Sequence, residues 1–284
     1  MAGMSIRLME QMYCYVGDVL GFSDMVTALT SEEKKELAPE QIAKFSRDAR
    51  ASRVDSWVQL VSGGLTEFKI SHYHFVSDTV FAGTEFTRYG LERLIDFSKY
   101  LLEEGMKKSL PLRGGIACGD VEWGDNISFG TAIIKAHKLE ADQEWIGTCC
   151  EPDLPGLDEL WDFKRVFVYP APMKNEKLLT HRPVIAWNVP TYVDLRNKTS
   201  ECTIRHINVD WKYDTMIRNT MLFSFCQKLI NVNFITGAKP NAFPGKPMEI
   251  IESCVDWVCH DKRLEQGGWK KQFVPNQRME TETL

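Results

Sequence analysis

Residues 13–23 read YCYVGDVLGFS, and this stretch decides the fold class that we expect for the chain. Its first seven residues are largely apolar and rich in aromatic side chains, as in a buried strand, and Gly21 then favours a tight turn. Asp18 is the one acidic residue of the stretch and lies near the end of the apolar run. The pattern therefore predicts a core strand that carries a carboxylate to the edge of a sheet.

The chain that follows, as far as residue 150, alternates between strand and helix patterns. Apolar residues at helical spacing predict helices, and short apolar runs between turn residues predict strands. In chain order we expect a helix at 42–60 that ends at Gly63 and Gly64, a hairpin of 68–76 and 79–82 around Ser77 and Asp78, a helix at 91–102, strands at 112–118 and 121–123 joined by a turn at Gly119 and Asp120, and a helix at 131–141. This order favours an α+β, ferredoxin-like core, in which helices cover one face of a mainly antiparallel sheet.

The patterns weaken beyond residue 150. The expected elements there are a late hairpin of 165–169 and 184–188, helices at 214–231 and 248–260, and a flexible polar tail after residue 266. We therefore expect a main domain at 8–200 and a C-terminal helical extension at 201–284 that packs on it.

Composition narrows the possible partners. The net charge of −5 disfavours a nucleic-acid partner, which usually requires a basic face. No run of about 18 apolar residues predicts a membrane span, and no signal peptide is recognisable, so we expect a cytoplasmic protein without a membrane partner. The eight cysteines lack paired CxxC spacing and are expected to be reduced packing residues.

Asp18 and Asp78 are the candidate metal ligands. If the first strand neighbours the hairpin, both carboxylates project from the same edge of the sheet. Hard cations such as Mg²⁺ or Mn²⁺ take oxygen ligands, commonly one or two carboxylates with substrate phosphates, and the carbonyl of Val19 is a further candidate. Turn amides often bind phosphate oxygens. The candidates for that role are Gly21, Phe22 and Ser23.

Either aspartate alone could simply be turn chemistry. A third pattern, in the expected order, weighs against that interpretation: residues 112–121 read LRGGIACGDV, followed by Gly130 and a helix. Together the motifs resemble those of the class III adenylate and guanylate cyclases, over roughly residues 12–190. The matches are 16–23 to the strand motif F-x-D-I-x-G-F-T, Ser77 and Asp78 to the G-D hairpin, 113–119 to R-x-G-I-x-x-G, and, in part, 130–139 to the helix motif G-x-x-V-N-x-A-x-R-L.

The resemblance implies the fold and the chemistry of that family. Two divalent metal ions per site, Mn²⁺ or Mg²⁺, are then held by Asp18 and Asp78, and Arg113 lies near the phosphates. The ribose 3′-hydroxyl attacks the α-phosphorus in line, which releases pyrophosphate and closes the cyclic ring. The family geometry also implies a two-fold homodimer whose two sites are each completed by residues of both subunits.

The chain departs from the family helix at two positions. Ile134 stands where the family has an asparagine that orients the ribose, and Lys138 stands where it has an arginine that stabilises the transition state. Lys138 can neutralise charge without the bidentate geometry of arginine. Lys135, one helical step away, is an alternative for this role, and a solvated helix face is the alternative for both lysines.

The base-selecting positions depart further. They hold His74 and Ile127, with Tyr73 beside the histidine, and neither matches the purine-reading pairs of the family. This pattern resembles the bacterial pyrimidine cyclases of Pycsar antiphage systems. The resemblance implies a lyase that makes cyclic UMP, or next cyclic CMP, for antiviral defence, with the product read by a separate receptor-effector. An adenylate cyclase that makes cyclic AMP and an inactive nucleotide-binding pseudo-cyclase remain the alternatives.

Overall fold

The computed structural model describes residues 9–21, 39–108, 110–124, 128–160, 165–174 and 181–188, together with positions 216, 219, 220, 223, 224 and 227. The strands are β1 (Glu10–Val19), β2 (His72–Val76), β3 (Thr79–Glu85), β4 (Leu112–Trp123), β5 (Ser128–Gly130), β6 (Gly147–Cys150), β7 (Val166–Pro170) and β8 (His181–Ile185). The helices are α3 (Pro39–Glu67), α4 (Arg88–Lys107), α5 (Thr131–Asp142) and the short 3₁₀-helix η1 (Asp158–Leu160). Among these residues no helix is long and apolar enough to cross a membrane.

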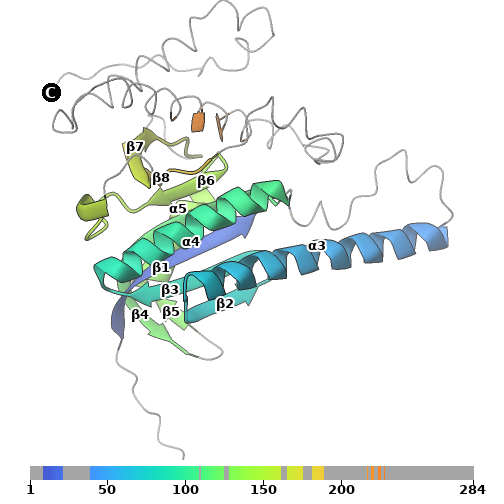
Figure 1. Cartoon of the computed structure of the whole chain (residues 1–284), viewed down its shortest axis with the longest axis horizontal. Coiled ribbons are helices and arrows are strands. Elements are labelled where there is room, and N and C mark those ends of the chain that lie inside the picture. The colour runs from blue at the N-terminus through green and yellow to red at the C-terminus, as the bar shows by residue number, and fades with distance from the viewer. Residues whose placement is uncertain are drawn as a thin grey trace, which may run out of the picture.

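The described strands form one sheet in the order β2-β3-β1-β4-β6-β8-β7, and β5 pairs with β4. All pairs are antiparallel except β4 with β6, which run parallel on either side of the connection through α5. Figure 1 shows α4 lying along the sheet and α3 reaching beyond it. The α+β class with a mostly antiparallel sheet, expected from the sequence, is confirmed.

The helices cover both faces of the sheet, whereas the sequence suggested one. Tyr15 points to the face covered by α3 and α4 and meets Phe97 of α4 edge-on. Val16 points to the opposite face, where it packs with Ala136 of α5. A side chain at Gly115 would come within 2.1 Å of the Ala136 carbonyl oxygen, so α5 lies directly on the sheet. The physical reason is that β1 is buried on both faces from Met12 onward, and one layer of helices cannot cover both.

Two breaks expected at glycine, the helix end at Gly63 and Gly64 and the turn at Gly119, are absent from the structure. The helix α3 does not end at Gly63 and Gly64 but runs through them to Glu67. A Cβ atom at Gly64 would lie 2.9 Å from the rings of Phe97 and Tyr100, so this glycine lets α3 approach α4 closely. The expected helix end is therefore a helix–helix contact.

The turn expected at Gly119 and Asp120 is also absent, because β4 continues through both residues and pairs with β1 there. A Cβ atom at Gly119 would lie 2.3 Å from Thr131 Oγ1, at the start of α5. Gly119 thus permits the close approach of α5 to an unbroken strand.

Other elements agree with the sequence. The β2–β3 hairpin turns at Ser77, whose φ of 60° is left-handed, and at Asp78. The expected helix at 91–102 is the centre of α4, and the late hairpin is β7 with β8. Four cysteines of the described strands are buried and unpaired with one another, as expected: Cys14, Cys118, Cys149 and Cys150.

Part of the expected C-terminal extension contacts the sheet. Thr220 is helical and its Oγ1 accepts a hydrogen bond of 2.8 Å from the amide of Ile146. Phe223 is buried against Trp145 and stacks on Phe167. The domain boundary at residue 200, the helix at 248–260 and the tail lie outside the described residues and stay predictions.

Candidate active site

Asp18 lies at the end of the central strand β1, between its two neighbours. Its cross-strand partners are Thr79 of β3 and Arg113 of β4. Thr79 Oγ1 donates a hydrogen bond of 3.0 Å to Asp18 Oδ1, and Arg113 Nη2 lies 3.8 Å from Asp18 Oδ2. The aspartate side chain is 22% exposed, so it is enclosed by the sheet but still reachable from solvent. The two strands therefore hold its carboxylate in one orientation.

Asp78 lies next to Asp18 because the hairpin turn is pinned to the end of β1. The amide of Val19 donates a hydrogen bond of 3.2 Å to the carbonyl oxygen of Asp78. The structure thus brings together Asp18, Val19 and Asp78, the three residues that the sequence indicated as metal ligands.

The surroundings of Asp18 disfavour the ionised form of its carboxylate. Burial, followed by the carboxylates of Glu140 and Asp78, raises the pKa of Asp18 from 3.8 to about 6. The Thr79 hydrogen bond and the Arg113 guanidinium lower it, but by less. A carboxylate whose ionised form is destabilised in this way, beside the further oxygen ligands of Asp78 and Val19, fits a hard divalent cation that would restore the ionised form. Within the described ranges, no three or more His, Cys, Asp and Glu side chains gather into a complete metal site.

Arg113 is anchored from behind by α5. Its Nε donates a hydrogen bond of 2.5 Å to Glu140 Oε1, and its Nη1 lies 3.4 Å from the carbonyl oxygen of Gln143. Glu140 is buried, and its second oxygen lies 3.3 Å from His137 Nδ1. The buried carboxylate thus holds the guanidinium with Nη2 toward Asp18.

Sequence reasoning missed the roles of Thr79 and Glu140. Nothing in the sequence near Thr79 marks it, because its role depends on the register of β1 with β3. The sequence does contain a pattern that indicates Glu140. Ala132, Ala136 and Glu140 follow one another at intervals of four residues, and all three are buried on one side of α5. A glutamate on an inward helix face needs a buried partner.

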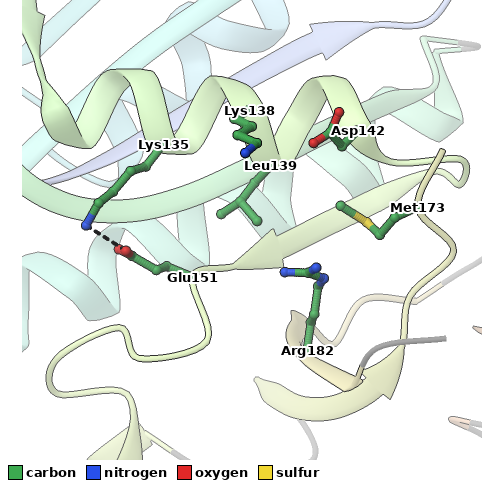
Figure 2. A pocket seen from close by; sticks show the side chains of 7 residues that line it. All are labelled: Lys135, Lys138, Leu139, Asp142, Glu151, Met173 and Arg182. Carbon is green, nitrogen blue, oxygen red and sulfur yellow. Dashed lines mark ion pairs between the residues drawn. The ribbon is translucent and has the colours of Figure 1, made fainter. Parts of the chain in front are cut away.

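Lys138 lies elsewhere on α5, at a pocket of about 450 Å³ (Figure 2). The residues that line the pocket are Lys135, Lys138, Leu139, Asp142, Glu151, Met173 and Arg182. Lys135 is engaged: its Nζ lies 2.6 Å from Glu151 Oε1 and donates to the carbonyl oxygen of Cys118. Lys138 is exposed, and in the described part of the chain no hydrogen bond or ion pair joins it to Asp18 or Arg113.

The candidate base-binding residues are separated by the pleat of β2. His74 pairs with Phe81, which packs on the α5 side, and Tyr73 pairs with Ala82, which belongs to the core under α4. Tyr73 is 44% exposed. His74 and Tyr73 therefore point to opposite faces, and His74 is the one on the face of Asp18.

The phosphate-binding and remaining base-binding candidates are covered only in part. Gly21 has a φ of 67°, the left-handed conformation that suits the turn expected after β1. Phe22, Ser23 and Ile127 lie outside the described residues, so their roles stay predictions.

Comparison with solved structures finds catalytic domains of nucleotide cyclases. The adenylyl cyclase CyaB from P. aeruginosa is 15% identical, covers 66% of this chain and 97% of its own, and has a TM-score of 0.40. The guanylate cyclase domain of RhGC from Catenaria anguillulae, in complex with GTP, is 12% identical, covers 62% and 97%, and has a TM-score of 0.43. The guanylyl cyclase domain of the RhoGC fusion protein from Blastocladiella emersonii is 11% identical, covers 63% and 96%, and has a TM-score of 0.44.

No protein-family model matches the chain, and no curated protein matches it.

Proposed function

We propose that the chain is a nucleotidyl cyclase that converts a pyrimidine nucleoside triphosphate, UTP before CTP, to its 3′,5′-cyclic monophosphate and pyrophosphate. The observation that carries the proposal is the proximity of Asp18 and Asp78 at the end of β1, beside the anchored guanidinium of Arg113. Two carboxylates and a cation at one sheet edge suit a substrate that is itself a metal-bound polyanion.

The chain's own residues supply orientation and charge. Asp18 and Asp78, with the carbonyl of Val19, would hold two divalent ions, Mn²⁺ or Mg²⁺; such ions activate the 3′-hydroxyl and neutralise the triphosphate. Thr79 orients the Asp18 carboxylate through its hydrogen bond. Turn amides at Gly21, and next to it at Phe22 and Ser23, bind phosphate oxygens in this proposal.

Arg113 is placed to stabilise charge that develops on the phosphates. Arg113 Nε donates a hydrogen bond of 2.5 Å to Glu140, whereas Nη2 lies 3.8 Å from Asp18. The Nη2 end of the guanidinium is therefore the less tightly held end. A guanidinium fixed before substrate arrives needs little reorganisation in the transition state.

Lys138 completes the site from a second copy of the chain. Its side chain is exposed. It makes no ion pair with Asp18, Asp78 or Arg113 of its own chain, the described residues that form the proposed metal edge. In the proposed two-fold homodimer, Lys138 of one subunit faces the triphosphate bound at Asp18 of the other, and two equivalent sites result. We extend the proposal to second-messenger synthesis in antiphage defence, with a separate receptor-effector that reads the product.

The experiment that tests this function is an assay of the purified chain with ATP, GTP, UTP and CTP separately, in Mn²⁺ or Mg²⁺, with products identified by mass spectrometry. We expect cyclic UMP as the main product and a smaller amount of cyclic CMP. Chelation of the metal by EDTA should abolish both products. Asp18→Asn and Asp78→Asn should each reduce turnover at least about 100-fold, whereas Asp153→Asn, at an exposed loop position, should not.

The other outcomes separate the alternatives. Cyclic AMP or cyclic GMP would keep the chemistry and replace the substrate. No product from any triphosphate, with nucleotide still bound, would replace the enzyme by a pseudo-cyclase.

A further inference from the structure

His74 is held in a defined orientation by two contacts on the Asp18 face of the sheet. Its ring stacks on that of Trp123 with a centroid distance of 5.2 Å and an interplanar angle of 3°. Its Nε2 lies 2.7 Å from Ser128 Oγ, across the space between β2 and β5. Stacking fixes the plane of the imidazole and the hydroxyl fixes its rotation, so Nδ1 has one direction in which to act.

The hydrogen bonds of Ser128 suit a His74 ring that carries its proton on Nδ1. Its Oγ already accepts a bond of 3.3 Å from the amide of Gly124. A serine hydroxyl has one proton to donate, and among the described residues His74 Nε2 is the acceptor within its reach. If the hydroxyl donates there, Nε2 is unprotonated and the neutral ring carries its proton on Nδ1.

We propose that Ser128 is a specificity-determining residue, which holds His74 as the Nδ1–H form so that Nδ1 donates a hydrogen bond to a carbonyl oxygen of the base. This inference rests on the proposed function and deepens it. Uracil presents the acceptor O4 where cytosine presents an amino group, which is a donor. A fixed N–H donor therefore pairs with uracil and faces the cytosine amine donor to donor. The geometry favours UTP over CTP through Ser128, a residue that does not itself need to touch the base.

The test combines a spectroscopic and a kinetic measurement on the full chain. Long-range ¹H–¹⁵N spectra at pH 8 distinguish the two neutral imidazole forms, and His74→Gln assigns the signal among the six histidines. We expect the Nδ1–H form in the unmodified chain and a shift toward the Nε2–H form in Ser128→Ala. The ratio of kcat/KM for UTP over CTP should fall in Ser128→Ala by roughly three- to tenfold, the effect of one hydrogen bond, and recover in Ser128→Thr.

Ser71→Ala is the matched control. Ser71 Oγ lies 3.2 Å from Nδ1 of His72 in an exposed serine–histidine pair, and His72 lies two residues before His74 on β2. His72 also contacts the edge of Trp123. The Ser71→Ala substitution should leave both the His74 signal and the ratio of kcat/KM for UTP over CTP unchanged.

The outcomes are distinguishable from failure of the proposed function. A chain that turns over no triphosphate contradicts the cyclase assignment and, with it, the role in selectivity, whereas the His74 spectrum still tests the protonation state. An Nε2–H ring in the unmodified chain overturns the inference even if cyclic UMP is made. An unchanged UTP to CTP ratio in Ser128→Ala, or a purine product, overturns it as well.

Discussion

At the scale of single residues, the candidate site holds one carboxylate, that of Asp18, whose ionised form is unfavourable in the protein without a bound cation. Asp18 is kept in a partly buried position where two other carboxylates help to raise its pKa to about 6. Near neutral pH the folded protein therefore holds a carboxylate whose ionised form is destabilised by its surroundings. Such a group is a liability for stability and an advantage for binding a cation.

Asp18→Asn should stabilise the metal-free chain at pH 8. The pKa is raised on folding, so the folded state binds more protons between pH 4 and 6, and stability falls as pH rises through that window. The difference between about 6 and 3.8 corresponds to at most roughly 3 kcal/mol above pH 6. Urea unfolding in EDTA should show a gain on this order at pH 8 and almost none near pH 4. Equal gains at both pH values would contradict an origin in the ionised carboxylate.

Glu140→Gln tests the anchor of Arg113. Removal of one charge from a buried ion pair leaves the guanidinium poorly compensated, so we expect the free energy of unfolding to fall by about 1–3 kcal/mol. The pKa of Asp18 should also fall, because the carboxylate of Glu140 is one cause of its elevation. Turnover should drop about tenfold, because Arg113 loses its fixed direction.

His137→Gln is the control for this substitution. His137 contacts the same carboxylate at 3.3 Å, but its side chain is largely exposed. It should change the free energy of unfolding by less than about 0.5 kcal/mol. A large loss in both variants would point to the helix rather than to the Arg113 pair.

At the scale of elements, some glycines lie inside a helix or strand because a neighbouring element packs closely against them there. Gly64→Ala should destabilise the chain by about 1–3 kcal/mol, because its Cβ would meet Phe97 and Tyr100 at 2.9 Å. Gly63→Ala, one residue away and exposed, would place its Cβ 3.1 Å from the hydroxyl oxygen of Tyr100, a single contact that a small shift of this partly exposed ring relieves. It should be neutral or stabilising, since alanine is the better helix former. Unfolding in urea compares the two, and similar losses would disprove the packing explanation.

The same elements show how far sequence reasoning reaches. It predicts β1, the β2–β3 hairpin and α4, because their patterns are local: an apolar run, a turn pair and a helical stripe. It misplaces the end of α3 and breaks β4, because a glycine needed for a close approach looks like a glycine that ends an element.

Of the site, the sequence predicts the neighbouring carboxylates of Asp18 and Asp78, because a strand and a turn carry them in a recognisable order. It cannot predict that Thr79 and Arg113 flank Asp18, or that Ser128 of β5 contacts His74 of β2, because these contacts depend on strand register and on strands far apart in sequence.

At the scale of the whole molecule, the proposed metal ligands Asp18 and Asp78 lie at the end of β1, whereas Lys138, the cation proposed to act with them, is exposed on α5. Lys138 has no ion pair with the described part of its own metal edge, so in the proposed homodimer two copies must meet for both halves to act together. The homodimer therefore makes a prediction that a monomeric site does not.

Co-expression of Asp18→Ala chains with Lys138→Ala chains should restore activity that neither variant has alone. In a mixed dimer one site collects both substitutions and the other collects none, so purified mixed dimers should have roughly half of the unmodified activity. The control is Asp18→Ala with Asp78→Ala: both substitutions damage the metal edge, every site in the mixed dimer retains a lesion, and no activity should return. Differently tagged chains, purified for both tags, are assayed for cyclic product. If the Asp18 and Lys138 pair stays inactive while its mixed dimers are recovered, each site is built within one chain and Lys138 does not act across the interface.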